Sequence, residues 1–130
     1  MRVLGVDYGK AKIGLSIGDT RTKLAEPLSV VKGKNPEEFA VKIERIVGDE
    51  RVEKIVVGVS DGVLGKESER FGEMLSEQVR IPVEFQDETL SSKDAQRMSI
   101  EAGIQRKKRQ RMEDAYAASL VLQSWMDKLA

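Results

Sequence analysis

The alternation of hydrophobic and polar residues predicts three β-strands in the first third of the chain. "VLGVD" (residues 3–7) is rich in β-forming residues. In "IGLSIGD" (13–19), large aliphatic residues alternate with Gly or Ser, which is typical of a strand that buries one face. Residues 8–12, which contain Gly9, would form the hairpin turn between these strands. A third strand is expected over 24–32, where Pro27 favours a sheet edge or a bulge.

The rest of the chain alternates helical and strand patterns. Asn35 can cap a helix that begins at Pro36, and the apolar run 54–60 is typical of a strand covered on both faces. The order βββαβαβαα predicts one α/β domain over residues 1–130, with a mixed five-stranded sheet flanked by helices. The remaining expected elements are a helix over 68–79, a strand over 81–88, a helix from Ser91 to Gly103, a basic loop "QRKKRQR" (105–111) and a helix over 112–129.

The composition excludes several kinds of chemistry. The chain has no cysteine and no histidine, which excludes disulfides, Cys-ligated zinc and histidine-based catalysis. Lys plus Arg and Asp plus Glu both number 22, so no overall basic charge favours nucleic acid. No apolar run approaches the roughly 18 residues of a membrane helix, and no signal peptide is visible. We therefore expect a cytoplasmic protein whose catalysis depends on carboxylates and on cations bound by oxygen.

Three carboxylates fall where this topology would bring them together. Asp7 ends the first strand, Glu88 ends the fifth, and Asp114 lies in the first turns of the last helix. The carboxyl ends of parallel strands open onto the same edge of a sheet, where ligand sites form. Carboxylates that converge repel one another unless a cation neutralises them. We therefore expect these three residues to be catalytic and to bind Mg²⁺ or Mn²⁺, the usual ions of all-oxygen sites.

Each of these assignments has an alternative. Asp7 could form a turn through its own backbone, and Asp114 could complement a helix N-terminus. Asp87 competes with Glu88, because neighbouring strand residues point to opposite faces and only one can face Asp7. Asp61, close after the fourth strand, is a further candidate for the third ligand.

The basic residues before the last helix are candidates for nucleic-acid binding. A cluster of cations could bind the phosphate backbone, although a charge run is also typical of a solvated connector. Tyr116 and Trp125 lie at helical spacing and are expected in the core rather than as stacking platforms for bases. The predicted nucleic-acid-binding residues are Lys10, Lys12, Arg106, Lys107, Lys108, Arg109 and Arg111.

Four motifs resemble those of the YqgF (RuvX) family: "VDYGKAKIGLSIGD", "IVVGVSDGVLGKE", "QDETLSS" and "EDAYAASLVLQSW". They occur in the family's order and span essentially the whole chain. The resemblance implies an RNase H-like fold related to Holliday-junction resolvases, with the acidic positions on Asp7, Glu88 and Asp114. It also implies a metal-dependent nuclease that matures the 5′ end of precursor 16S ribosomal RNA, with branched DNA as another possible substrate.

The chain departs from the family pattern at three positions. Ser60 replaces a usual Pro, Leu64 a usual Asp, and Thr89 a usual Arg. Loss of that Arg removes a planar, bidentate phosphate contact. These changes leave open a second function, a ribosome-assembly module that binds RNA without cleaving it.

A phosphotransferase is a third function that the sequence allows, because a similar hairpin begins the actin and sugar-kinase folds. Those folds enclose ATP between two domains, and 130 residues supply one. The expected partner is structured RNA or branched DNA rather than a membrane, and the expected state is a monomer or a weak dimer.

Overall fold

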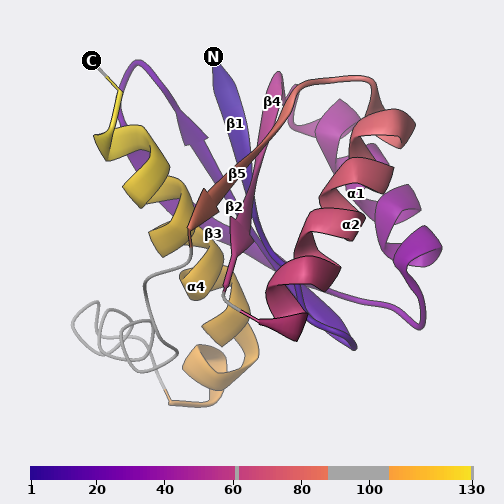
Figure 1. Ribbon diagram of the computed structural model, residues 1–130. Helices are drawn as coiled ribbons and strands as arrows, with labels where there is room; N and C mark the ends of the chain where they lie inside the picture. Colours follow the sequence, from indigo (N-terminus) through magenta and orange to yellow (C-terminus); the bar gives the residue numbers. More distant parts are fainter. Residues whose placement is uncertain (61, 88–105, 130) are drawn as a thin grey trace.

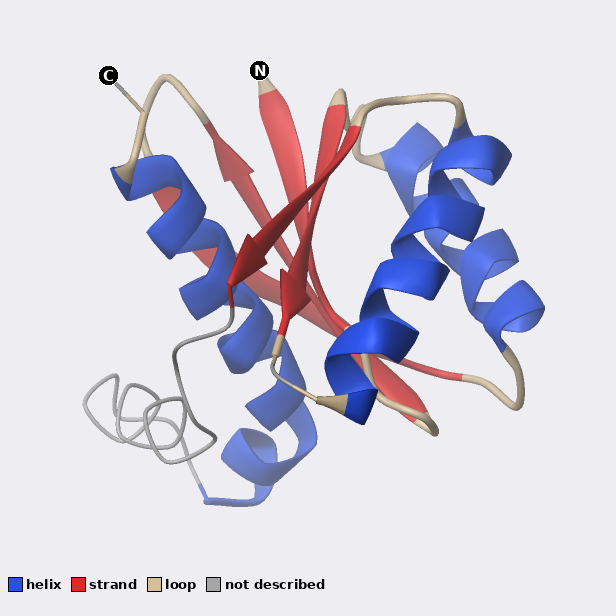
Figure 2. Ribbon diagram, viewed as in Figure 1, coloured by secondary structure: helices blue, strands red, loops and turns tan. Residues whose placement is uncertain are grey.

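The computed structural model describes residues 1–60, 62–87 and 106–129, which form a five-stranded sheet between two layers of helices (Figures 1 and 2). The strand order is β3-β2-β1-β4-β5. β2 is antiparallel to both β1 and β3, whereas β1, β4 and β5 are parallel. The elements are β1 (Arg2–Asp7), β2 (Lys12–Asp19), β3 (Leu24–Lys32), α1 (Pro36–Asp49), β4 (Lys54–Val59), α2 (Val63–Val79), β5 (Val83–Asp87) and α4 (Arg106–Asp127).

The strand predictions for the first part of the chain are confirmed. β3 is an edge strand, and its register with β2 shifts from Leu15–Ser29 to Ser16–Pro27, so it also carries a bulge. Pro27 therefore lies where the missing N–H does least harm to the sheet. α1 begins as expected at Pro36, and the side chain of Asn35 accepts a hydrogen bond of 2.8 Å from the backbone N–H of Glu38.

Two helices begin earlier than the sequence pattern predicts. α2 begins at Val63, because Gly65 admits the first turn against the backbone of Ser60, where a Cβ atom would overlap the Ser60 carbonyl. α4 begins at Arg106, so residues 106–111 are helical and the predicted basic loop is wrong there. Lys, Arg and Gln are good helix formers, and this run contains no Gly or Pro to interrupt them. The helix expected from Ser91 to Gly103 lies outside the described residues.

Large side chains form the core between the sheet and the α1/α2 layer. Leu4 and Val6 of β1 pack here, and aromatic rings from α1 and α2 cover them. Phe39 and Phe71 contact each other edge to face at 6.5 Å between ring centroids. Ile55 and Val57 face this layer while Val56 packs against α4, so β4 is covered on both faces as predicted.

Candidate active site at the carboxyl edge of the sheet

α4 lies on a track of small residues in β1 and β2. The sequence pattern assigned only one buried face to β2, and this is wrong, because Gly14, Ser16 and Gly18 are buried beneath α4. The Ser16 hydroxyl donates a hydrogen bond of 2.8 Å to the carbonyl of Ala118, four residues beyond Asp114. Four helical residues rise about 6 Å and two strand residues about 6.7 Å, so the helix stays in step with the strand.

Gly14 fixes the position of Asp114. A Cβ atom at Gly14 would overlap the main-chain carbonyl of Asp114, so only glycine allows α4 to approach this closely. The contact is between two backbones and does not depend on a rotamer. Asp114 is therefore held against β2 at the level of Gly14.

Asp7 lies on the same face of the sheet as Asp114. Val3 packs against α4, and a Cβ atom at Gly5 would meet the Ala118 carbonyl, so alternation along β1 directs Asp7 toward α4 as well. Asp7 is also the direct partner of Gly14 in the β1–β2 register. The fold thus brings Asp7 and the backbone of Asp114 to one place, at the end where β1, β4 and β5 finish (Figure 1).

Lys12 provides a cation at this place. Its Nζ lies 3.1 Å from Oδ2 of Asp114, and the two side chains are 53% and 31% exposed. Such an exposed pair contributes at most about 1 kcal/mol to stability. The pair matters for the chemistry of the site, because the carboxylate of Asp114 is already paired with a cation.

The register of β5 separates Asp87 from this face. Val57 faces the α1/α2 layer, and its partner in β5, Phe85, faces the same layer and lies against Gly72 of α2. Asp87, two residues further along β5, therefore faces that layer as well. Asp7 faces α4 instead, so Asp87 does not share its side of the sheet. Glu88 and Asp61 lie outside the described residues, and the assignment of the third ligand stays a prediction.

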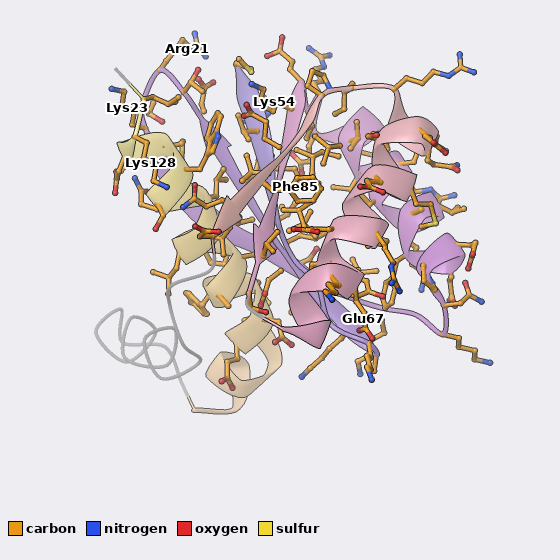
Figure 3. All side chains as sticks on the ribbon, in the orientation of Figure 1. Arg21, Lys23, Lys54, Glu67, Phe85 and Lys128 are labelled. Atoms are coloured by element: carbon orange, nitrogen blue, oxygen red, sulfur yellow. The ribbon has the colours of Figure 1, made fainter. Side chains whose placement is uncertain are left out.

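The other predicted residues divide between the core and the surface. Tyr116 is buried, as expected of a core residue. Trp125 is half-buried and packs against the core on the α4 side, with Nζ of Lys54 at 5.4 Å from its ring centroid. Lys10 is exposed, on the hairpin between β1 and β2. Figure 3 labels Lys54, the first residue of β4, and Lys128, which directly follows α4.

Carboxylate oxygens are the donors that Mg²⁺ and Mn²⁺ prefer, so the chemistry of the predicted ligands fits these ions. Two of the three, Asp7 and Asp114, belong to the described residues, and the third does not. In the part of the chain that the structure describes, no group of three or more His, Cys, Asp or Glu residues is arranged to hold a metal ion. The ammonium of Lys12 contacts the carboxylate of Asp114, so one of the two described ligand candidates already accommodates a cation.

The track of small residues was missed as a determinant of the site. Its signal was present in the sequence, as glycine or serine at each second position of the second strand. The same alternation is expected of a strand with one face in water, so the pattern alone does not reveal a helix on that face.

Comparison with known proteins agrees with this architecture. The family described as "RuvX: Holliday junction resolvase" matches residues 1–128. A protein of Caldanaerobacter subterraneus subsp. tengcongensis, named "Putative pre-16S rRNA nuclease", is 40% identical over 134 residues, or 98% of this chain and 96% of its own. A protein of Dictyoglomus thermophilum with the same name is 35% identical over 133 residues, again 98% and 96%.

Two solved structures share the fold. "T. thermophilus RuvC in complex with Holliday junction substrate" has a TM-score of 0.63 at 16% identity, covering 98% of this chain and 97% of that one. The fowlpox virus Holliday junction resolvase has a TM-score of 0.65 at 14% identity and full coverage of both chains. The predicted α/β, RNase H-like fold is therefore confirmed. Among the described residues, none of the helices is long and apolar enough to cross a membrane.

Proposed function

The chain belongs to the RuvX family, and from this premise we propose that it is a divalent-metal-dependent nuclease that matures the 5′ end of precursor 16S ribosomal RNA. The relatives' printed name supports the ribosomal RNA substrate. The observation that supports catalysis best is the backbone contact between Gly14 and Asp114 beside Asp7, because it holds two carboxylate-bearing residues at one sheet edge.

In this proposal Asp7 and Asp114, together with Glu88, hold the cation. A bound Mg²⁺ or Mn²⁺ supplies a water of lowered pKa and stabilises negative charge on phosphate oxygens. Asp7 is positioned by β1, and Asp114 by the contact of α4 with Gly14. Once a metal ion occupies the Asp114 carboxylate, the ammonium of Lys12 would leave it and contact a phosphate oxygen of the substrate.

Substitution of Asp7 tests this assignment most directly. We expect Asp7→Asn to reduce Mg²⁺- or Mn²⁺-dependent cleavage of a precursor 16S RNA fragment at least a thousandfold, since it removes a ligand charge while keeping the shape of the side chain. Circular dichroism and thermal unfolding should match the wild type. Asp49→Asn, at an exposed position in α1, is the control and should retain full activity.

The same assay with a chelator can contradict the catalytic assignment. If wild-type protein and Asp7→Asn cleave equally and a chelator changes neither rate, the carboxylates are not catalytic. If neither cleaves but both bind the RNA equally tightly, the non-catalytic assembly module is the better description.

Branched DNA is the second candidate substrate. The family description supports it, and the two structural neighbours above are named for Holliday junctions, although their low identity shows only the fold. The same protein should therefore be assayed on a four-way DNA junction at matched salt. Cleavage of the junction at a higher kcat/KM than the RNA would reverse the preferred substrate.

The basic start of α4 is proposed to bind the phosphate backbone. We expect Arg109→Gln to weaken RNA binding and to lower the slope of log Kd against log salt by about 0.7, the value for one lost single-strand phosphate contact. Arg45→Gln, on the exposed surface of α1, removes the same charge elsewhere and should leave the slope unchanged. Equal slopes for the two variants would remove this part of α4 from the interface.

A further inference from the structure

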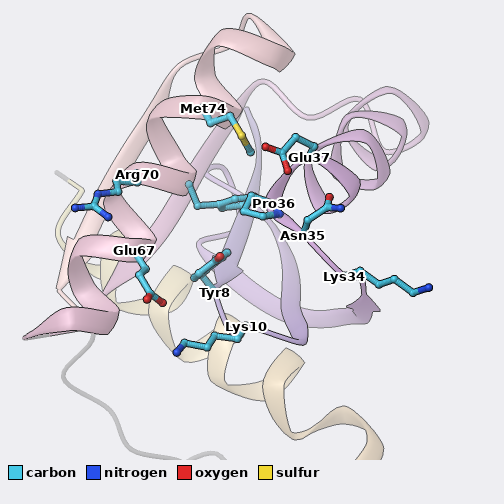
Figure 4. A pocket seen from close by; sticks show the side chains of 10 residues that line it. Tyr8, Lys10, Lys34, Asn35, Pro36, Glu37, Glu67, Arg70 and Met74 are labelled. Carbon is cyan, nitrogen blue, oxygen red and sulfur yellow. The ribbon is translucent and has the colours of Figure 1, made fainter.

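A pocket of about 440 Å³ lies on the α1/α2 face of the sheet, opposite the face that carries α4, between the β1–β2 hairpin, the start of α1 and α2 (Figure 4). Its volume lies within the usual range for small-molecule sites. Tyr8 lines it and directly follows Asp7, so the pocket and the candidate active site are flanked by consecutive residues at the end of β1, one on each face of the sheet. The other lining residues that matter are Lys10, Glu37, Glu67, Arg70 and Met74.

The floor of the pocket is formed by aromatic rings that contact one another. The ring of Tyr8 stacks on Phe71 with 4.8 Å between centroids and an interplanar angle of 27°, and it meets Phe39 edge to face at 6.5 Å. Phe71 is buried, while Tyr8 is partly exposed and lines the opening. An aromatic side chain fixed in this way offers a preorganised surface for a flat ligand.

Charged groups surround this floor without pairing with one another. Among the described residues, Glu37, Glu67, Lys10 and Arg70 form no ion pair and no side-chain hydrogen bond. Burial, and then the negative charges of Glu67 and Glu37, raise the pKa of Tyr8, so both carboxylates act on the space around its ring. The pocket therefore offers hydrogen-bond acceptors next to the aromatic ring and cations beside them.

We infer that this pocket binds an unpaired base of the substrate strand, next to the phosphate that is cleaved at Asp7, and selects a base that carries an exocyclic amino group. This inference rests on the proposed nuclease function. The aromatic floor receives the base, Glu37 and Glu67 accept hydrogen bonds from its amino and imino groups, and Lys10 and Arg70 contact the adjoining phosphate.

Guanine fits these groups best. Its N1–H and N2–H₂ are adjacent donors that one carboxylate can accept together. Uracil presents one donor, N3–H, between two carbonyl oxygens, so a carboxylate that accepts from N3–H gains one hydrogen bond fewer and also faces a carbonyl oxygen. A missing hydrogen bond to a charged group weakens binding by about tenfold.

Binding without cleavage tests the inference independently of catalysis. The probes are a uridine-only RNA strand, the same strand with one central guanosine, and the same strand with one central inosine, which lacks the N2 amino group. With chelator present, we expect the wild type to bind the guanosine strand about tenfold more tightly than the uridine strand, with inosine between them.

Glu67→Gln should bring the three affinities together, because an amide lacks the charge that favours the amino group. Glu73→Gln removes the same charge from an exposed position of α2 and should keep the wild-type ratio. The readout is a ratio of affinities for one protein, so partial unfolding of a variant does not mimic the effect.

Equal affinities of the wild type for the three strands, or an unchanged ratio in Glu67→Gln, would overturn the inference. Either result could occur in an active nuclease and would leave the proposed function standing. Base preference without any metal-dependent cleavage would instead support the pocket and contradict the nuclease.

Discussion

The two faces of the sheet are built from different kinds of residue, and the difference separates stability from positioning. Toward α1 and α2, Leu4, Val6 and other large aliphatic residues interlock with aromatic rings. Toward α4, Gly5 and Gly14 bring two backbones together, with the Ser16 hydroxyl bonded to a helix carbonyl between them. When one side chain of a core is substituted, its neighbours can adjust their rotamers, whereas two backbones in contact can accommodate an added atom only by moving apart.

The consequence is that the α4 face determines where Asp114 lies, and the other face determines how firmly the chain folds. Both carboxylate-bearing residues of the described site are on the α4 face. Variants that are matched between the two faces should therefore affect stability and activity in different proportions. The predictions below are arranged from the largest expected effect on the free energy of unfolding to the smallest.

Leu75→Ala should cause the largest loss of stability. Leu75 of α2 is fully buried, and such truncations lower the free energy of unfolding by about 2–5 kcal/mol. The rate of RNA cleavage per folded molecule, measured well below the unfolding temperature, should stay within about twofold of the wild type. Urea denaturation and a single-turnover assay give the two values. A large fall in the rate would mean that the α2 layer also positions the catalytic groups.

Gly14→Ala should lower the free energy of unfolding less and activity much more. The new methyl group would overlap the Asp114 carbonyl, so α4 must move away from β2. Overpacking of this kind costs about 1–3 kcal/mol. A displacement of about 1 Å at a catalytic group can reduce the rate about a hundredfold. The same denaturation and single-turnover assays test both expectations.

Gly72→Ala is the matched substitution on the opposite face. Its new methyl group would meet the ring edge of Phe85, which is 42% exposed and can move. We expect a change in unfolding free energy below about 1 kcal/mol, because the gain in helix propensity offsets the adjustment of the ring. Activity should be retained. Equal loss of activity in the two glycine variants would contradict the distinction between the faces.

Local sequence patterns were sufficient to predict those elements whose ends are marked by a capping residue or a proline. Asn35 and Pro36 fixed the start of α1, and Pro27 indicated the edge and the bulge of β3. The start of α4 was not found, because a run of charges was interpreted as a solvated loop although each residue in it favours a helix. The early start of α2 was not found either, because it depends on the close approach of Gly65 to the backbone of Ser60.

The candidate site depends on contacts that no local pattern contains. That Asp7 and Asp114 would converge was inferred from topology, but the means, a glycine on the neighbouring strand, is a contact between residues 14 and 114. The pairing of Lys12 with Asp114 is hidden for the same reason. The direction of Asp87 needed the register of β5, which only the paired strands define.

Lys12→Met should have the smallest effect on stability and the most specific effect on the metal. The ion pair between Lys12 and Asp114 is exposed, so its loss should change the free energy of unfolding by less than about 1 kcal/mol. Because the ammonium and a divalent cation compete for the Asp114 carboxylate, its removal should lower the Mn²⁺ concentration for half-maximal cleavage by roughly fivefold, since the metal no longer displaces an ion pair that contributes about 1 kcal/mol. Lys42→Met breaks a similar exposed pair with Glu38, 3.2 Å long, on α1 and should leave the Mn²⁺ requirement unchanged. A higher Mn²⁺ requirement in Lys12→Met would mean that the ammonium helps to assemble the metal site, and the pair would then be part of that site rather than its competitor.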